Sequence, residues 1–115
     1  VWGAPIGTHQ GIAHPLAEAK IETELARLMT YKAAWLYDEE LEAGEAANIA
    51  KYAAAEAAIH ALDQAIQTHG GHGLSSEYGL ADLWGGVRLL RTAPISREMI
   101  LNFVAQHSLG LPKSY

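Results

Sequence analysis

Residues 49–73 read IAKYAAAEAAIHALDQAIQTHGGHG, and this stretch decides the fold class. Alanine fills most positions between its large apolar residues, which are Ile49, Ile59, Leu62 and Ile66. Alanine has the highest helix propensity of all residues, and an alanine-rich face lets a neighbouring helix approach closely. The glycines of HGGHG (69–73) then end the pattern, because glycine readily adopts the left-handed conformation that helix termini commonly use. The sequence therefore predicts a helix over residues 45–68 that packs against other helices.

A long helical pattern precedes this stretch, from residue 8 to about residue 41. Apolar residues recur in it at three- and four-residue steps, namely Ile12, Leu16, Ile21, Leu25, Leu28 and Met29. Thr8 is a candidate N-cap. Pro15 predicts a kink or a later start, because proline removes a backbone donor and clashes with the preceding turn. Gly44 breaks the pattern before the next helix.

Two shorter segments follow the alanine-rich helix. The segment 78–91 is helical in pattern but contains Gly85-Gly86, and the segment from about 94–96 to 108 carries an apolar face. No segment alternates between apolar and polar residues as a strand would. The sequence therefore predicts an all-α fold, a four-helix bundle of the up-and-down type, with residues 1–115 as a single domain.

Composition excludes several classes of function. The chain has 115 residues, no cysteine and a formal net charge of −5, with no block of Lys or Arg. Nucleic acid is an unsuitable partner because its phosphates require a basic surface. Without cysteine, disulfides and thiolate metal sites are ruled out. No apolar run is long enough to insert into a membrane.

Histidines and carboxylates are the first candidates for chemistry. His69 and His72 are spaced so that they could share a metal ion, but no Asp or Glu nearby would complete the ligand set. We interpret both as histidines of a turn and predict no metal site; His60 and His107 are interpreted as surface or packing residues. The carboxylates of YDEELEAGE (37–45) are typical of a solvated helix end. HGGHG follows a helix, whereas phosphate-binding loops follow a strand and open a helix.

Lys51 and Glu56 interrupt the alanine-rich helix with charge. They could pair with a partner helix, although a surface position is the interpretation that the pattern alone favours. From the residues themselves, the sequence indicates a helical bundle without a complete catalytic site.

Three segments stand in order along the chain: WGAPIGTHQ (2–10), IAKYAAAEAA (49–58) and QTHGGHG (67–73). Together they resemble the C-terminal helical domain of acyl-CoA dehydrogenases, the flavoenzymes that oxidise acyl thioesters. The first is similar to the family's Phe-Gly-x-Pro-Ile…Gln motif, and the third matches its Gln-x-x-Gly-Gly-x-Gly motif. The second is similar to the family's Ala-Lys…Glu segment, with Ala50, Lys51 and Glu56 in place.

The resemblance implies a set of cofactor-binding residues. Trp2 stands where the family has Phe, and Gln10, Gln67 and the backbone of Gly70 and Gly71 match positions that hold the ADP part of FAD on a neighbouring subunit. Glycine lets backbone N–H groups approach a phosphate closely, and glutamine supplies an amide for adenine or ribose.

RTAPISREMI (91–100) is similar to the family's Tyr-Glu-Gly-Thr-Ser-Glu-Ile segment, in which the first Glu is commonly the base that removes the α-proton. Ungapped alignment places Ser96 on the Thr, Glu98 on the second Glu and Pro94 on the base, and the resemblance implies Ser96 and Glu98 as further cofactor-binding residues. Proline accepts no proton, so the catalytic residue stays unknown; some branches place it on an earlier helix, and others pair unlike subunits. Glu98 lies about one helical turn beyond the expected position of the base. We interpret it as a cap or a flavin-side contact rather than the base. An Arg-Asp pair usual in the family is absent near Gly85-Gly86.

The resemblance thus implies the C-terminal domain of a longer polypeptide, an FAD-dependent acyl-CoA dehydrogenase. Its own share would be oligomerisation and contacts with a neighbouring subunit's FAD, without catalysis by the chain alone. Implied partners are an acyl-CoA substrate, like or unlike dehydrogenase subunits and electron-transfer flavoprotein as acceptor. The implied location is the cytoplasm, or the mitochondrion in a eukaryote. Two alternatives remain: a non-catalytic helical oligomerisation module or degenerate subunit, and a histidine-based metal-binding bundle.

Overall fold

The computed structural model describes residues 2–114; Val1 and Tyr115 lie outside the described residues. Its helices are α1 (Gln10–Asp38), α2 (Gly44–His69), α3 (Leu80–Leu89) and α4 (Arg97–His107), with short 3-10 turns η1 (Ile6–Thr8) and η2 (Gly70–Leu74). No strand occurs between residues 2 and 114. The predicted all-α fold with four helices is confirmed, and each helix begins and ends within three residues of its predicted bounds.

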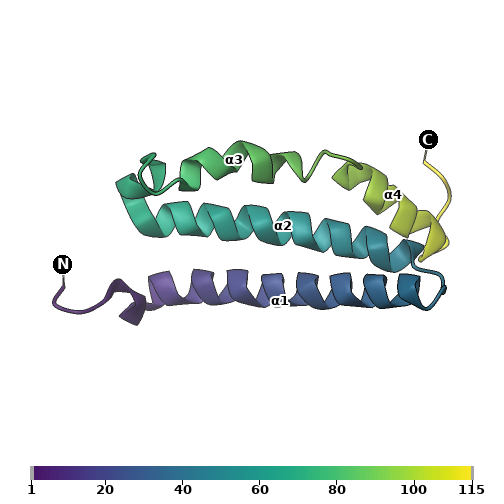
Figure 1. Ribbon diagram of the computed structural model, residues 1–115, viewed down its shortest axis with the longest axis horizontal. Coiled ribbons are helices and arrows are strands. Elements are labelled where there is room, and N and C mark those ends of the chain that lie inside the picture. The colour runs from purple at the N-terminus through teal and green to yellow at the C-terminus, as the bar shows by residue number, and fades with distance from the viewer. Residues whose placement is uncertain (1, 115) are drawn as a thin grey trace.

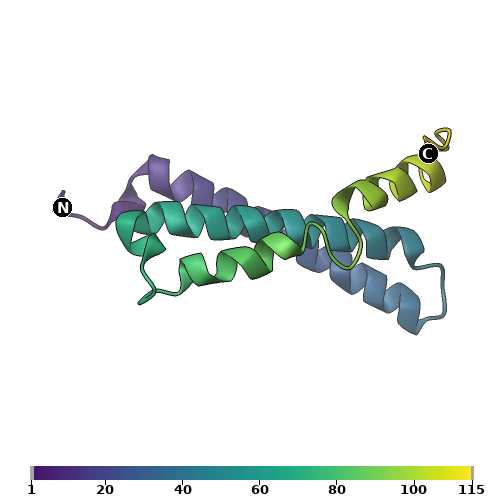
Figure 2. The ribbon, with the colours of Figure 1, turned by 90° about the horizontal axis from the view of Figure 1, so that it is seen from above.

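The four helices lie in an open arrangement around α2 (Figures 1 and 2). Helix α1 runs antiparallel to α2 along one side, while α3 and α4 follow each other along the other side. Within the described residues, α1 contacts neither α3 nor α4. The radius of gyration is 17.6 Å, against about 13 Å for a compact domain of this length. Helix α2 is therefore the central element, and two short helices together cover its second side.

Few side chains are buried in this arrangement. The buried apolar residues are Ala19 and Ala26 of α1, Ala46, Ala50, Ala55, Ala57, Ile59 and Leu62 of α2, and Ile100 of α4. The chain exposes 8022 Å², whereas a compact monomer of this mass exposes roughly 6,100 Å². Much of the excess is apolar, including a row on α1 formed by Ile21, Leu25, Leu28 and Trp35. These side chains recur at helical spacing and so share one face.

The start of α1 differs from the prediction. Thr8 is not the N-cap: its hydroxyl donates to the carbonyl of Pro5 at 2.8 Å, and His9 occupies the N-cap position without a capping hydrogen bond from its side chain. The helix also begins before Pro15 and continues through it. The missing N–H of Pro15 falls near the helix start, where a single lost bond, to the carbonyl of Gly11, is tolerated within 29 residues of helix.

Glycines shape the turn after α2. Gly70 follows the helix with φ 57° and ψ −137°, a combination essentially restricted to glycine rather than the left-handed helical conformation that we expected. Gly73 is buried, and a Cβ there would lie 2.4 Å from the carbonyl oxygen of Ile66. The turn therefore folds back tightly onto α2 only because glycine stands at both positions.

Helix α3 passes through Gly85-Gly86 without a break, and a Cβ at either position would meet no other atom. Among residues 2–114, no helix combines the length and apolarity needed to cross a membrane.

Candidate functional site

The predicted cofactor-binding residues fall into two groups. Trp2, Gln10, Gln67, Gly70 and Gly71 belong to the start of α1 and the end of α2, which lie at the same end of the molecule (Figure 1). Ser96 and Glu98 belong to the start of α4, beside the middle of α2 (Figure 2). The antiparallel pairing of α1 and α2 is what brings the first group together across more than fifty residues of sequence.

A hollow of about 540 Å³ lies at this end of the molecule, and Trp2 is the member of the first group that lines it. Its lining comes from both chain segments and consists of Trp2, Ile6, His9, Ile12 and Thr68. The rings of Trp2 and His9 meet edge to face, with centroids 6.4 Å apart. Trp2 nevertheless keeps 78% of its surface exposed. This end of the molecule thus offers an aromatic surface of the kind that stacks on a planar ring.

The turn beyond α2 supplies polar groups next to this hollow. The side chains of Gln10 and Gln67 are exposed, and within the described residues their amides make no hydrogen bond. The N–H of Gly70 donates to the carbonyl of Gln67, whereas Gly71 has open space around it. Two unengaged amides and an accessible glycine backbone are a suitable donor set for phosphate, ribose or adenine.

The two histidines of HGGHG pack on one tyrosine. The centroids of His69 and His72 lie 5.6 Å and 5.5 Å from that of Tyr78. The Nδ1 of His69 also lies 2.7 Å from the carbonyl oxygen of Ala65. No three His, Asp or Glu side chains in residues 2–114 come together as a metal site. Both histidines thus contact Tyr78 through their rings, at the turn that follows α2.

The second group lies at the joint between α3 and α4. Ser96 caps α4, its hydroxyl accepting from the N–H of Met99 at 3.3 Å. Glu98 lies exposed in the first turn of α4, where a carboxylate interacts favourably with the helix dipole. Pro94 and Ile95 are exposed at the tip of the joint. The hydroxyl of Ser96 and the exposed tip are the parts of the joint that a ligand could reach.

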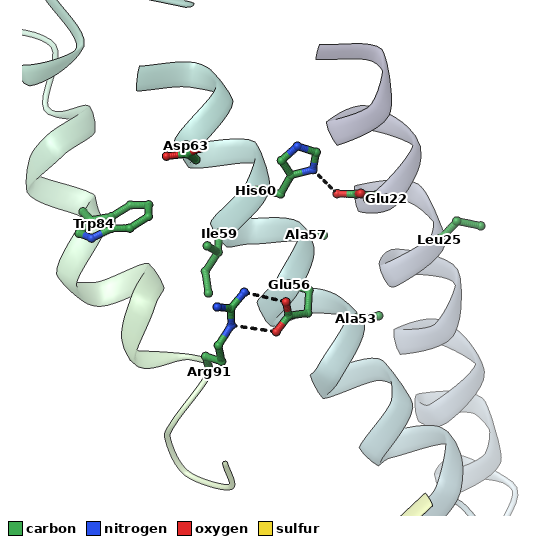
Figure 3. A pocket seen from close by; sticks show the side chains of 10 residues that line it. All are labelled: Glu22, Leu25, Ala53, Glu56, Ala57, Ile59, His60, Asp63, Trp84 and Arg91. Carbon is green, nitrogen blue, oxygen red and sulfur yellow. Dashed lines mark hydrogen bonds and ion pairs between the residues drawn. The ribbon is translucent and has the colours of Figure 1, made fainter. Parts of the chain in front are cut away.

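An ion cluster fixes this joint to α2 (Figure 3). The guanidinium of Arg91 donates to both oxygens of Glu56, at 2.9 Å and 2.6 Å. The Nε of Arg97 lies 3.3 Å from Oε1 of Glu56, an ion-pair contact without hydrogen-bond geometry. Lys51 donates to the carbonyl of Leu90. The pattern favoured a surface position for Lys51 and Glu56, but both side chains have partners beyond α2, as the alternative of pairing with another helix predicted, and Glu56 is half-buried.

Tyr52 completes the cluster. Its hydroxyl accepts from Nη2 of Arg97 at 3.2 Å, and the guanidinium lies 5.4 Å from the ring centroid. This hydrogen bond, helped by the nearby carboxylates of Glu56 and Glu98, raises the pKa of Arg97 above its ordinary value. Arg97 stays charged, as an ion pair with Glu56 requires.

A second hollow, of about 530 Å³, extends from the cluster between the three helices α1, α2 and α3 (Figure 3). The Nδ1 of His60 lies 2.6 Å from the carboxylate of Glu22 on α1. Trp84 of α3 and Asp63 of α2 line the same hollow. His60 is thus a packing residue between two helices, one of the two roles that the sequence indicated.

The comparisons with known proteins identify the family. The family model described as "Acyl-CoA dehydrogenase, C-terminal domain" matches residues 1–109. The chain belongs to the acyl-CoA dehydrogenase family. Acyl-CoA dehydrogenase FadE12 of Mycobacterium tuberculosis is 65% identical over 117 residues, which cover 100% of this chain and 30% of the relative. Acyl-CoA dehydrogenase family member 11 of Rattus norvegicus is 37% identical over 110 residues, or 94% of this chain and 14% of the relative.

Solved structures share the fold of this acyl-CoA dehydrogenase domain. PigA with FAD and proline superposes with a TM-score of 0.92 at 28% identity, covering 96% of this chain and 29% of PigA. The domain therefore spans about a third or less of the length of these relatives. The likeness includes a protein whose solved structure contains FAD.

Sequence reasoning missed Arg91, Arg97 and Tyr52. In the sequence, each of them belongs to a helix pattern or to an aligned motif, and nothing there indicates its ion-pair or hydrogen-bond partner. The isolated carboxylate of Glu56 in an alanine-rich helix was the available signal, since a charge among packing residues calls for an opposite charge nearby. The sequence could not say which of the eight Lys and Arg residues would supply it.

Proposed function

We propose that this chain acts as the C-terminal domain of a longer, FAD-dependent acyl-CoA dehydrogenase, and that its share is subunit assembly and contact with a neighbouring subunit's FAD. The observation that carries the proposal is the meeting of residues 2–12 and 67–71 at one end of the molecule. That end combines an aromatic hollow with the unengaged amides of Gln10 and Gln67.

These residues fit the ADP part of FAD. Gln10 and Gln67 would hydrogen-bond adenine or ribose, and the backbone at Gly71 would approach phosphate, where no side chain stands in the way. The N–H of Gly70 is already used by Gln67, so Gly70 contributes the shape of the turn. Bound flavin supplies the oxidant for α,β-dehydrogenation of an acyl-CoA thioester.

We propose further that this chain does not supply the base for the α-proton. Pro94, at the aligned position, has no group that accepts a proton. Glu98 lies on the first turn of α4, and Arg97 beside it interacts with its charge. The base then belongs to another part of the polypeptide or to another subunit, and this chain alone would be inactive.

The open fold supports the assembly role. The chain exposes roughly 1,900 Å² more than a compact monomer of its mass, and stable obligate interfaces bury about 2,000 Å² or more. The exposed row on α1 suits contact with further helices of like or unlike dehydrogenase subunits. Electron-transfer flavoprotein is the proposed acceptor of the electrons, and the cytoplasm, or the mitochondrion of a eukaryote, is the proposed location.

The experiment is flavin retention by the complete dehydrogenase that contains this domain. Gln67→Ala should weaken FAD binding about tenfold, the worth of one or two hydrogen bonds. Gln106→Ala, on α4 away from this end, is the matched control and should retain FAD. Equal retention by both variants would contradict the assignment of Gln67.

Glu98→Gln tests the proposal that this chain does not supply the base for the α-proton. Loss of a general base costs about 10²- to 10⁴-fold in rate, whereas loss of a flavin-side contact should lower kcat by less than about tenfold. A loss of about a thousandfold with intact flavin binding would identify Glu98 as the base and overturn the proposal.

The exposed row on α1 also favours a second candidate, a non-catalytic oligomerisation module or degenerate subunit. The two candidates differ in flavin uptake. A complete protein that assembles, remains colourless and takes up no added FAD would favour the module and count against the dehydrogenase.

A further inference from the structure

We infer that Glu56 is a positioning residue for the dehydrogenase reaction, because its single carboxylate fixes the joint of residues 91–97 to α2. The inference rests on the proposed function, which places this joint beside the flavin and the acyl chain. Glu56 itself touches no ligand in this role; it acts through Arg91 and Arg97.

One carboxylate holds both ends of the joint. Arg91 is the first residue of the joint and binds Glu56 through a two-pronged contact of 2.9 Å and 2.6 Å. Arg97 is the last residue, and its Nε lies 3.3 Å from the same carboxylate. Paired Arg–carboxylate hydrogen bonds fix direction as well as distance, because both groups are planar. The joint therefore has one defined position along α2.

The backbone closes the joint above this anchor. The N–H of Arg97 donates to the carbonyl of Arg91 at 2.9 Å, so the two arginines meet at the base of a short loop. The N–H groups of Thr92 and Ala93 donate back to the carbonyl of Leu89, which ties the first half of the loop to α3. What the closed loop presents outward is its tip, Pro94 and Ile95.

Neighbouring residues of α2 reinforce the anchor. Tyr52 lies one helical turn before Glu56 and accepts a hydrogen bond from Arg97. Lys51 donates to the carbonyl of Leu90, directly before the joint. Glu56 thus pairs with two cationic side chains, and Lys51 adds a contact to the backbone just before the joint. Without Glu56 the two guanidinium groups would repel each other, and the joint would lose its charged anchor on α2.

The position of the joint should affect the rate of the reaction as well as the stability of the fold. Dehydrogenation depends on the relative placement of acyl chain and flavin, and a misplacement of about 1 Å can cost about 10²-fold in rate. The loop tip lies at the position that the family alignment assigns to the base. A shift of the tip should therefore lower the rate of flavin reduction while leaving substrate binding nearly intact.

The test uses the complete, FAD-loaded dehydrogenase with Glu56→Gln, Glu56→Asp and the control Glu22→Gln. Glu22 also pairs across helices, with His60, but has no ion pair or hydrogen bond with Arg91 or Arg97. Glu56→Gln should slow flavin reduction by saturating acyl-CoA at least tenfold, with KM changed less than about threefold. Glu56→Asp restores the charge on a shorter side chain and should recover part of the rate. Glu22→Gln should leave the rate unchanged.

Backbone hydrogen exchange supplies a readout independent of activity. In Glu56→Gln, the amides of Thr92, Ala93 and Arg97, which donate to backbone carbonyls, should exchange at least tenfold faster, and in Glu22→Gln they should not change. Faster exchange with an unchanged rate of flavin reduction would overturn the positioning role. Equal losses in the rate of flavin reduction in Glu56→Gln and Glu22→Gln would overturn the positioning role too, since they would indicate general destabilisation of the protein.

Failure of the proposed function would look different. If the unaltered protein neither bound FAD nor oxidised any acyl-CoA, the positioning role in that reaction would fall with the proposed function. Exchange at Thr92, Ala93 and Arg97 would still decide whether Glu56 fixes the joint: acceleration in Glu56→Gln alone would support the anchor, and no acceleration in that variant would overturn the anchor itself.

Discussion

On one side of α2, helix α1 packs through small apolar side chains, whereas on the other side α3, α4 and their joint are held by a buried isoleucine and an ion cluster. Ala19 and Ala26 of α1 are buried where α2 presents its own alanines. Opposite them, Ile100 is 1% exposed and Glu56 binds two arginines. Small alanine side chains let the two helices approach closely, while paired charges fix the direction and distance of the joint.

This difference shows how one helix can serve two purposes. The α1 side builds a long, continuous two-helix layer whose outer face remains apolar and exposed. The α3–α4 side consists of short helices that would be mobile without specific anchors, because helices of ten or eleven residues are marginal on their own. The anchors occur where the short helices meet, at the joint that the proposed function places beside the flavin.

The largest effect is expected from truncating the best-buried side chain on the α3–α4 side. Ile100→Ala should lower the free energy of unfolding by about 2–5 kcal/mol, because it leaves a cavity among Ile49, Tyr52 and Val104. Urea denaturation followed by circular dichroism measures the change. Met99→Ala, at a position that is 51% exposed, is the control and should cost much less. Equal losses would mean that α4 does not pack as described.

A smaller loss is expected from enlarging a side chain on the α1 side. Ala57 is 4% exposed against α1, and Ala57→Leu should cost about 1–3 kcal/mol by pushing the helices apart. Ala47→Leu places the same side chain at an exposed position of α2 and should be nearly neutral. The denaturation midpoints of both variants, measured at one protein concentration, compare their losses of stability. A neutral Ala57→Leu would show that the α1–α2 contact is loosely packed.

The smallest effect is expected at the exposed ion pairs of α1. Hydrogen bonding from Lys20, with Arg27 nearby, lowers the pKa of Glu24 below its ordinary value. The stabilisation is thus present at neutral pH and is lost as the pH falls through that lowered pKa. Glu24→Gln should cause a slight loss in denaturation midpoint at pH 7 and none in strong acid. Glu18→Gln is the control on the same helix, and a larger effect from Glu18 would contradict the assignment.

The sequence predicted the helices well because their signals are local. Alanine content, apolar spacing and the glycines of HGGHG act within a few residues, and α2 ends at His69 as they indicated. Local signals failed at Thr8, whose hydroxyl binds the carbonyl of Pro5 instead of capping α1. They also left the course of the helix at Pro15 open, because the long α1–α2 contact outweighs one missing hydrogen bond.

The candidate site was only partly visible in the sequence. Gln10 and Gln67 were named from ordered motifs, and the antiparallel helices then brought their segments to one end of the molecule. The ion cluster at the joint was not foreseen, since Glu56 is 35 residues from Arg91 in sequence. Pairing across such a separation depends on how helices pack, and a charge pattern does not specify its partner.

By itself, the sequence determined the all-α class, the extent of each helix and the family motifs, because helix propensity, periodicity and turn glycines act over a few residues. Only the tertiary structure decided that α2 is central, that the second side is covered by two short helices and that Glu56 fixes the joint between them. These features depend on contacts between distant residues, whose free energy comes from packing and from ion pairs that form only once the helices lie side by side.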